Sequence, residues 1–220
     1  MAFVDQACSE LLAEEAGTLL VMARGLGLQR VLRQLVEQHS APQHLVFLLN
    51  ASKEEEELLL HDMTMRGVAQ QPALINNECS AQERIELYLG GGVLLVTARI
   101  LIVDLLCERV PVEQATGIIV ANAHRVSEGG NVAFILRVVR QRNKHAFIKA
   151  LSDDACSLTN GFSKAEKVMR SLFARKLHVW PRFHMAAAAE LDRTQPIVEE
   201  LSVPLSRREL GLGLGLATEP

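Results

Sequence analysis

Two glycines lie where a phosphate-binding turn would need them. In the stretch LLVMARGLGLQRVL, Gly25 and Gly27 separate an apolar run from an amphipathic segment. In a P-loop such glycines let backbone N–H groups wrap a phosphate, and a lysine and a hydroxyl residue follow them. Here Leu28 and Gln29 stand in those two places, and Arg30 replaces the third glycine of the dinucleotide-binding pattern. A tight strand-to-helix turn is therefore the favoured interpretation, with simple nucleotide binding as the alternative.

Basic residues are concentrated in one part of the chain. The net charge is −3 over 220 residues, but residues 1–130 hold 9 Lys/Arg against 17 Asp/Glu. Residues 131–184 hold 11 Lys/Arg against 3 Asp/Glu, a balance of +8. A local excess of this size indicates a polyanionic partner. The alternative is that these cations pair with the acidic first part of the chain.

The spacing of these cations favours contacts with a phosphate backbone. Arg137 and Arg140 are three residues apart and would share one face of a helix. A row of this kind makes DNA binding depend on salt. A solvated face, or pairing with acids such as Asp153 and Asp154, is the alternative. The candidate DNA-binding residues of this region are Arg137, Arg140, Arg142, Lys144, Lys164, Lys167 and Arg170.

Aromatic residues are interleaved with the later cations. Phe173, Trp180 and Phe183 lie among them in the sequence. Rings in such a setting can stack on unpaired bases. For Trp180, however, packing in the core is the preferred interpretation.

The elements that would position these residues alternate in type. Short apolar runs predict strands covered on both faces, at 18–23, 44–49, 92–97, 117–122 and 146–152. Segments with apolar residues at every third or fourth position predict helices, at 26–39, 52–67, 80–91 and 131–144. This alternation predicts an α/β fold with a mostly parallel sheet.

Polar and glycine residues mark the expected helix ends. Ser52 and Ser80 are expected N-caps, and Glu55 completes a capping box with Ser52. Gly67 and Gly90 lie where a C-terminal glycine is expected.

The pattern changes near residues 158–161. We expect an α/β lobe over 1–158, a basic helical segment over 159–203 and an unstructured tail over 204–220. In the second segment, the only hint of a strand is the stretch IVEELSV.

Several classes of protein are excluded by composition. No apolar run reaches the length of a membrane-spanning helix, and the acidic N-terminus lacks the features of a signal peptide. The four cysteines lie far apart without a CxxC pair, which predicts reduced thiols in an intracellular protein and no zinc site. Glu54–Glu57 are expected to form a solvated first helical turn and not a metal site.

Two strand ends resemble those of superfamily 2 helicases. IIVANAHRV is similar to their strand that ends V-D-E-A-H-R, with Ala121 in place of the magnesium-binding Asp and Asn122 in place of the catalytic Glu. His124 and Arg125 are kept, and structural roles are expected for them. AFIKALSDDA takes the place of the S-A-T strand. The degenerate nucleotide site would thus comprise Gly25, Gly27, Leu28, Gln29, Ala121 and Asn122.

A third helicase-like strand end supplies a candidate DNA contact. LLVTARILIVDLL is similar to the T-P-x-R-L strand, turn and helix of these enzymes. In helicases that turn contacts the backbone of single-stranded DNA, which the resemblance carries to Thr97 and Arg99. The alternative is that Thr97 caps a helix and Arg99 is solvated.

One family combines these features. ARGLG, GGVLLVTARILIVDLL, AFILRVVRQRNKHAFIKALSD and KVMRSLFARKLHVWPRFH resemble the XPF family of DNA repair endonucleases, which includes yeast Rad1 and fly Mei-9. The resemblance covers roughly residues 8–203. It implies the RecA-like first lobe of a disabled helicase, followed by the start of a helical domain.

The resemblance also implies a role and a set of partners. The family incises DNA on the 5′ side of lesions in nucleotide excision, crosslink and recombination repair, in the nucleus. This part would bind single-stranded or branched DNA and a nuclease scaffold protein. The E-R-K-x-x-x-D nuclease motif does not occur in these residues. No cofactor is therefore expected in this chain, and Mg or Mn and the small non-catalytic partner subunit would belong to C-terminal domains.

The sequence also allows three other interpretations. The first is a protein-interaction scaffold with little affinity for DNA, and the second is a nucleotide-driven motor. The third is that the chain forms no stable product, because missing domains leave an apolar face uncovered.

Overall fold

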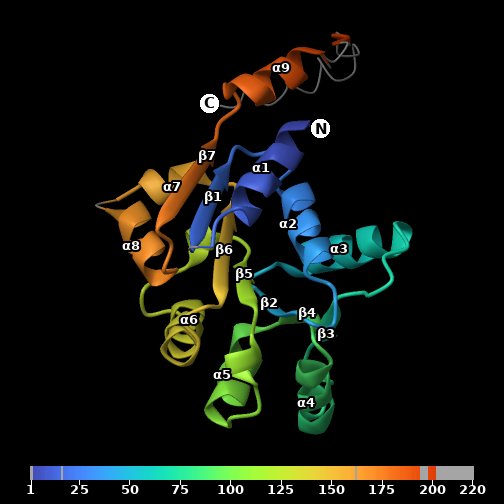
Figure 1. Cartoon of the computed structure of the whole chain (residues 1–220). Helices are drawn as coiled ribbons and strands as arrows, with labels where there is room; N and C mark the ends of the chain where they lie inside the picture. Colours follow the sequence, from blue (N-terminus) through green and yellow to red (C-terminus); the bar gives the residue numbers. More distant parts are fainter. Residues whose placement is uncertain (1, 16, 162, 194–197, 202–220) are drawn as a thin grey trace, which may run out of the picture.

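A parallel sheet forms the centre of the fold (Figure 1). The computed structural model describes residues 2–15, 17–161, 163–193 and 198–201. The strands are β1 (Thr18–Met22), β2 (Leu45–Leu49), β3 (Ala73–Ile75), β4 (Gly92–Val96), β5 (Gly117–Val120), β6 (Phe147–Ser152) and β7 (Lys176–Trp180). In this part of the chain their order in the sheet is β3-β4-β2-β5-β6-β1-β7, and all pairs are parallel. The predicted α/β class is confirmed.

Helices cover both faces of the sheet. On one face lie α1 (Ala2–Leu12), α2 (Leu28–Gln38), α3 (Lys53–Met65) and α9 (Met185–Arg193). On the other lie α4 (Ala81–Gly90), α5 (Ala98–Leu106), α6 (Asn131–Arg142), α7 (Ala155–Thr159) and α8 (Lys164–Ser171). Short 3-10 turns occur at Val112–Gln114 and Ala123–Arg125.

The apolar runs of the sequence become strands buried on both faces. In β1, Leu19 and Val21 join the core under α5 and α6, while Leu20 and Met22 join the core under α1 and α2. Successive side chains of a strand point to opposite faces, so one continuous apolar run serves two cores. This explains why the five expected strands show no polar alternation.

The sheet has two strands that the sequence did not reveal. β3 is only three residues long, and β7 carries exposed residues at Lys176, Leu177 and Val179. Both are edge strands, and an edge strand needs less apolar character than a central one. β7 pairs with β1 over its full length, from Thr18↔Lys176 to Met22↔Trp180.

This pairing corrects the expected organisation of 159–203. The segment is not a helical addition, because β7 lies within it and belongs to the same sheet as the strands before residue 158. The sheet thus extends past the boundary expected near 158–161. Of the stretch IVEELSV, residues 198–201 form no strand, and its other residues and the tail 204–220 lie outside the described residues.

The helix ends follow the expected polar signals closely. Both Ser52 and Ser80 form capping boxes, with Glu55 and Glu83 respectively. Gly67 has a left-handed φ of 65°, as a C-terminal glycine should. α4 instead includes Gly90 as its last residue, and Gly91 is its C-cap. An added Cβ at Gly91 would lie 2.0 Å from the carbonyl oxygen of Pro42.

No helix within the described residues is both long and apolar enough to cross a membrane.

Candidate functional site

The expected nucleotide-site residues gather at the carboxyl edge of the sheet. Gly25 and Gly27, with φ values of 83° and 92°, form the turn between β1 and α2. Ala121 and Asn122 directly follow β5. Parallel strands end at one edge, so residues about 95 positions apart in the sequence meet there.

Glu55 of α3 occupies the centre of this edge. Its Oε1 accepts a hydrogen bond from Gln29 Nε2 at 2.7 Å, and its Oε2 accepts one from Asn122 Nδ2 at 2.6 Å. The backbone N–H of Ser52 also donates to Oε2 at 2.8 Å. One carboxylate thus joins the helix after β1, the helix after β2 and the loop after β5. Glu54–Glu57 were expected to be solvated, and for Glu55 this was wrong.

Two asparagines tie the ends of β2 and β5 together. Asn50 Nδ2 donates to the carbonyl oxygens of Ala121 and Asn122 at 2.9 and 3.1 Å. Asn122 Nδ2 in turn donates to Asn50 O at 3.3 Å. Both residues have left-handed backbones, with φ values of 64° and 49°, a conformation that asparagine adopts more readily than most residues.

The glycine turn is held from the side of β7. Arg182 Nη2 donates to Arg24 O at 2.8 Å, and the N–H of Ala23 donates to Trp180 O at 2.9 Å. Arg24 forms ion pairs with Asp153 at 3.8 Å and Asp154 at 3.3 Å. The two aspartates, which the sequence offered as partners of the basic helix, therefore pair with the glycine turn.

His124 contacts the end of a neighbouring strand. Its Nδ1 lies 3.0 Å from Ser152 Oγ at the end of β6. Burial lowers the pKa of His124 from its ordinary value, although Asp154 and Asp153 oppose this effect. This contact agrees with the structural role expected for His124.

These residues do not fit a nucleotide and its magnesium. Leu28 supplies no cation, Ala121 supplies no metal ligand, and Gln29 and Asn122 both donate to Glu55. Within the described residues, no group of three or more His, Cys, Asp or Glu side chains could hold a metal ion.

Thr97 and Arg99 lie at the same carboxyl edge, after β4. Both are exposed, and Thr97 is the N-cap residue of α5. Its side chain makes no capping hydrogen bond. The hydroxyl and the Arg99 side chain are thus available to a ligand.

A second group of cations surrounds Phe173 at the ends of α6 and α8. Two adjoining depressions, of about 200 and 580 Å³, lie here. We call them together the basic groove; the cations that line it are Arg137, Arg140, Lys144, Arg170 and Arg175. Two carboxylates, Glu128 and Glu15, also line it.

Arg140 is half-buried, and its side chain contacts other residues of the groove. Its guanidinium lies 5.8 Å from the centre of the Phe173 ring, and its Nη1 donates to Lys144 O at 2.6 Å. Burial and the nearby Arg175 lower its pKa from the ordinary value. Arg137, Lys144 and Arg175 are exposed, and none has a side-chain partner among the described residues.

The other predicted cations contribute less to the groove. Arg142 pairs with Glu108 at 3.2 Å, and Arg170 pairs with Glu166 at 2.8 Å. Lys167 is exposed on α8, whereas Lys164 is half-buried. Neither lysine lines the groove.

The predicted DNA contacts therefore form two separate surfaces. Thr97 and Arg99 follow the last residue of β4, at the carboxyl edge. Lys144 precedes β6 and Arg175 directly precedes β7, at the amino edge. α6 and α8 both contribute to the basic groove, through Arg137 and Arg170 respectively.

The three aromatic residues among the later cations differ in how far they are buried. Trp180 is 2% exposed and packs against Phe3 and His184, so it cannot stack on a base without unfolding of its surroundings. Phe173 is half-buried in the groove, and Phe183 is exposed.

The roles of two residues at these sites, Glu55 and Arg175, were not predicted from the sequence. Glu55 was recognised only as a cap, because capping spacing is local and its bonds to Gln29 and Asn122 are not. Arg175 lies in the basic region 131–184 but is not among the residues predicted to contact DNA. Its position directly before β7 could have been predicted only if the edge strand β7 itself had been predicted.

Comparison with known proteins supports the resemblance. No family model matches the chain. It is 43% identical over 194 residues to the DNA repair endonuclease XPF of Cricetulus griseus, covering 88% of this chain and 21% of that protein. It is 36% identical over 214 residues to the DNA repair endonuclease UVH1 of Arabidopsis thaliana, covering 96% and 22%.

Similarity extends to yeast proteins and to a solved structure. The DNA repair protein RAD1 of Saccharomyces cerevisiae is 30% identical over 241 residues, covering 94% of this chain and 22% of that protein. The Pyrococcus furiosus Hef helicase domain superposes with a TM-score of 0.70 at 17% identity, covering 85% of this chain and 39% of that one. The chain spans about a fifth of the length of the curated relatives it matches. By sequence and by fold, it is homologous to the N-terminal, helicase-like region of the XPF/Rad1 family of DNA repair endonucleases.

Proposed function

We propose that this chain is a DNA-binding and protein-docking part of a structure-specific DNA repair endonuclease, without ATPase or nuclease activity of its own. The observation that carries the proposal is the basic groove, where exposed Arg137, Lys144 and Arg175 lie around Phe173. Guanidinium and ammonium groups on such a surface bind phosphates without reading sequence.

The edge that holds ATP in helicases has a structural role in this proposal. Glu55 accepts from Gln29 and Asn122, so these polar groups are satisfied inside the protein. The proposal includes no cofactor for this chain; Mg or Mn would act in a nuclease domain of the whole protein. A small non-catalytic subunit would bind that part too, and a scaffold protein would bind the helicase-like part. The place of action would be the nucleus.

Charge variants of the groove test DNA binding. We expect Arg137→Gln/Lys144→Gln to weaken binding of labelled single-stranded and forked DNA in fluorescence anisotropy. Each lost phosphate contact should lower the slope of log affinity against log salt by roughly 0.7–0.9. The control is Lys53→Gln/Arg193→Gln, which removes the same charge from exposed positions on other helices.

A third variant compares the two surfaces. Thr97→Ala/Arg99→Gln alters the carboxyl edge and leaves the groove unchanged. A loss confined to this variant would move the DNA contact to that edge and overturn the role of the groove. Absence of binding at low salt by a folded, monodisperse sample would favour a scaffold with little DNA affinity, for which the acidic character of residues 1–130 is the supporting observation.

A further inference from the structure

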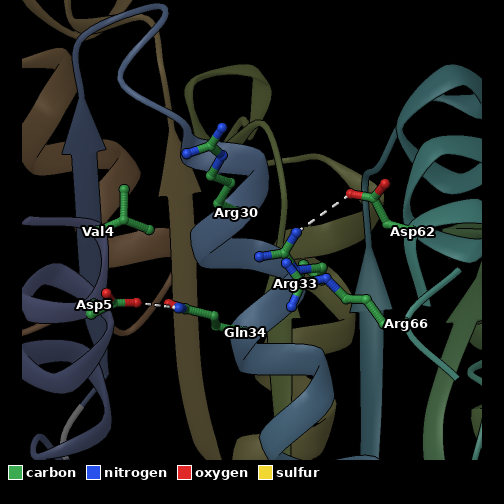
Figure 2. A pocket seen from close by; sticks show the side chains of 7 residues that line it. All are labelled: Val4, Asp5, Arg30, Arg33, Gln34, Asp62 and Arg66. Carbon is green, nitrogen blue, oxygen red and sulfur yellow. Dashed lines mark hydrogen bonds and ion pairs between the residues drawn. The ribbon is translucent and has the colours of Figure 1, made fainter. Parts of the chain in front are cut away.

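A second charged depression lies on the opposite face of the sheet from the basic groove. It has a volume of about 600 Å³ and lies where α1, α2 and α3 meet (Figures 1 and 2). We call it the arginine depression; its lining residues are Val4, Asp5, Arg30, Arg33, Gln34, Asp62 and Arg66. It shares no residue with the Glu55 network or with the basic groove.

The lining of this depression contains more guanidinium groups than carboxylates. Asp62 pairs with Arg33, but at a long 3.6 Å. Asp5 accepts a hydrogen bond of 2.5 Å from the side-chain amide of Gln34. Arg30 and Arg66 are exposed, and within the described residues neither has an ion-pair partner.

One donor is buried without any acceptor. The Arg33 side chain is only 11% exposed, and its Nε has no hydrogen-bond partner. A buried charge with a single distant partner is costly unless further hydrogen bonds satisfy it. Figure 2 shows the Arg66 side chain extending from the end of α3 toward Arg33. Arg33 therefore lacks an acceptor at a place where a second guanidinium is close.

The arrangement of charges, with the arginines between two aspartates, favours a compact anion as the ligand. In Figure 2, Asp5 and Asp62 lie on opposite sides of Arg30 and Arg33. A nucleic-acid strand running across the depression would approach a carboxylate at each side. A single phosphate monoester carries close to two charges and three acceptor oxygens on one small group, and arginine clusters bind such groups well.

We propose that the arginine depression binds the phosphate group of a phosphorylated side chain on a partner polypeptide. Arg30 and Arg66 supply exposed guanidinium groups, and Arg33 supplies the buried Nε–H. Because this face is opposite the basic groove, a partner can bind here while the groove holds DNA.

The test compares peptides that differ only in the phosphate. The probes are a fluorescein-labelled pool of peptides with a central phosphoserine and degenerate flanks, the same pool unphosphorylated, and a 5′-phosphorylated oligonucleotide. We expect the phosphorylated pool to bind the full chain at least tenfold more tightly than the unphosphorylated pool. Arg30→Gln/Arg66→Gln should abolish that difference. The Arg33 Nε–H resonance should shift on titration with the phosphorylated pool, since it gains an acceptor.

The control variant separates this site from DNA binding. Arg137→Gln/Lys144→Gln should leave phosphopeptide binding unchanged, and Arg30→Gln/Arg66→Gln should leave DNA binding unchanged. Equal binding of the two peptide pools, or binding that survives Arg30→Gln/Arg66→Gln, would overturn the proposal. Loss of oligonucleotide binding alone in that variant would also overturn it, because the depression would then be a nucleic-acid site.

Discussion

At the scale of single residues, polar side chains hold the carboxyl edge of the sheet together. Glu55 bonds to Gln29 and Asn122, and Asn50 bonds to the loop after β5. Each of these bonds joins segments far apart in the sequence. The same four residues thus stabilise the carboxyl edge, and their contribution can be measured as folding stability.

We expect Glu55→Gln to lower the free energy of unfolding by about 1–2 kcal/mol. An amide offers one acceptor oxygen where the carboxylate offers two, so one of the donors Gln29 Nε2, Asn122 Nδ2 or Ser52 N loses its partner. Urea unfolding followed by circular dichroism measures the change. Glu57→Gln, at an exposed position of the same helix, is the control; an equal effect of both variants would contradict the network.

Lys149 is a second residue whose burial affects the stability of the fold. It is 3% exposed, and its Nζ donates to Leu11 O at 2.6 Å and also to Glu14 O, at the end of α1. Burial lowers the pKa of Lys149 to about 8. The ammonium therefore donates to two backbone carbonyls at the end of the helix, where intrahelical donors run out.

This lowered pKa makes stability depend on pH. Between pH 8 and the ordinary lysine value near 10.4, the folded state releases the Lys149 proton while the unfolded state keeps it. The free energy of unfolding should therefore rise with pH over this window, by about 3 kcal/mol relative to Lys149→Met. Denaturation at pH 7, 8, 9 and 10 measures the difference. Parallel pH curves for the two proteins would show that the pKa of Lys149 is not lowered.

At the scale of elements, one buried carboxylate connects α4, α5 and the loop that follows. Asp104 is fully buried and accepts from Arg84 Nε at 2.7 Å, Tyr88 Oη at 2.8 Å and Arg109 Nη1 at 3.0 Å. Burial alone would raise its pKa, but the hydrogen bonds from Arg84, Tyr88 and Arg109 hold the pKa of Asp104 below its ordinary value. These elements support Thr97 and Arg99 at the start of α5.

We expect Asp104→Asn to destabilise the protein by about 3–5 kcal/mol, because it leaves two guanidinium groups beside a neutral side chain. The wild-type advantage should be complete above the unfolded pKa of Asp104 and should be lost as the pH falls through the lower folded pKa. Thermal unfolding from pH 7 to pH 3 measures both effects. A variant as stable as the wild type at pH 7 would contradict this account.

At the scale of the whole molecule, β7 makes residues after 160 part of the sheet. β7 pairs with β1, Trp180 lies in the core under α1, and Leu172 lies in the core on the other face. Removal of this segment would leave β1 with one unpaired edge and expose apolar surface on both faces.

We therefore expect a chain of residues 1–160 to aggregate or to lose cooperative unfolding, whereas residues 1–201 should behave as the full chain does. Size-exclusion chromatography and thermal circular dichroism compare the three proteins. A monomeric 1–160 with a cooperative transition would instead support the domain boundary expected near 158–161.

What the sequence by itself determined is local or nearly local. Five strands, the helices α2, α3, α4 and α6, the capping box of α3 and the N-cap of α4 were predictable, because apolar runs and capping pairs act over a few residues. That Leu28 supplies no cation and Ala121 no metal ligand was also visible, since this depends on the residue type at one position.

What only the tertiary structure decided depends on long-range contacts. The edge strands β3 and β7 owe their conformation to pairing with β4 and β1, and the sequence of an edge strand carries a weak apolar signal. The bonds of Glu55 and the division of the cations between two ends of the sheet have the same origin. A parallel sheet brings distant strand ends to one edge, and only the order of its strands determines which side chains meet there.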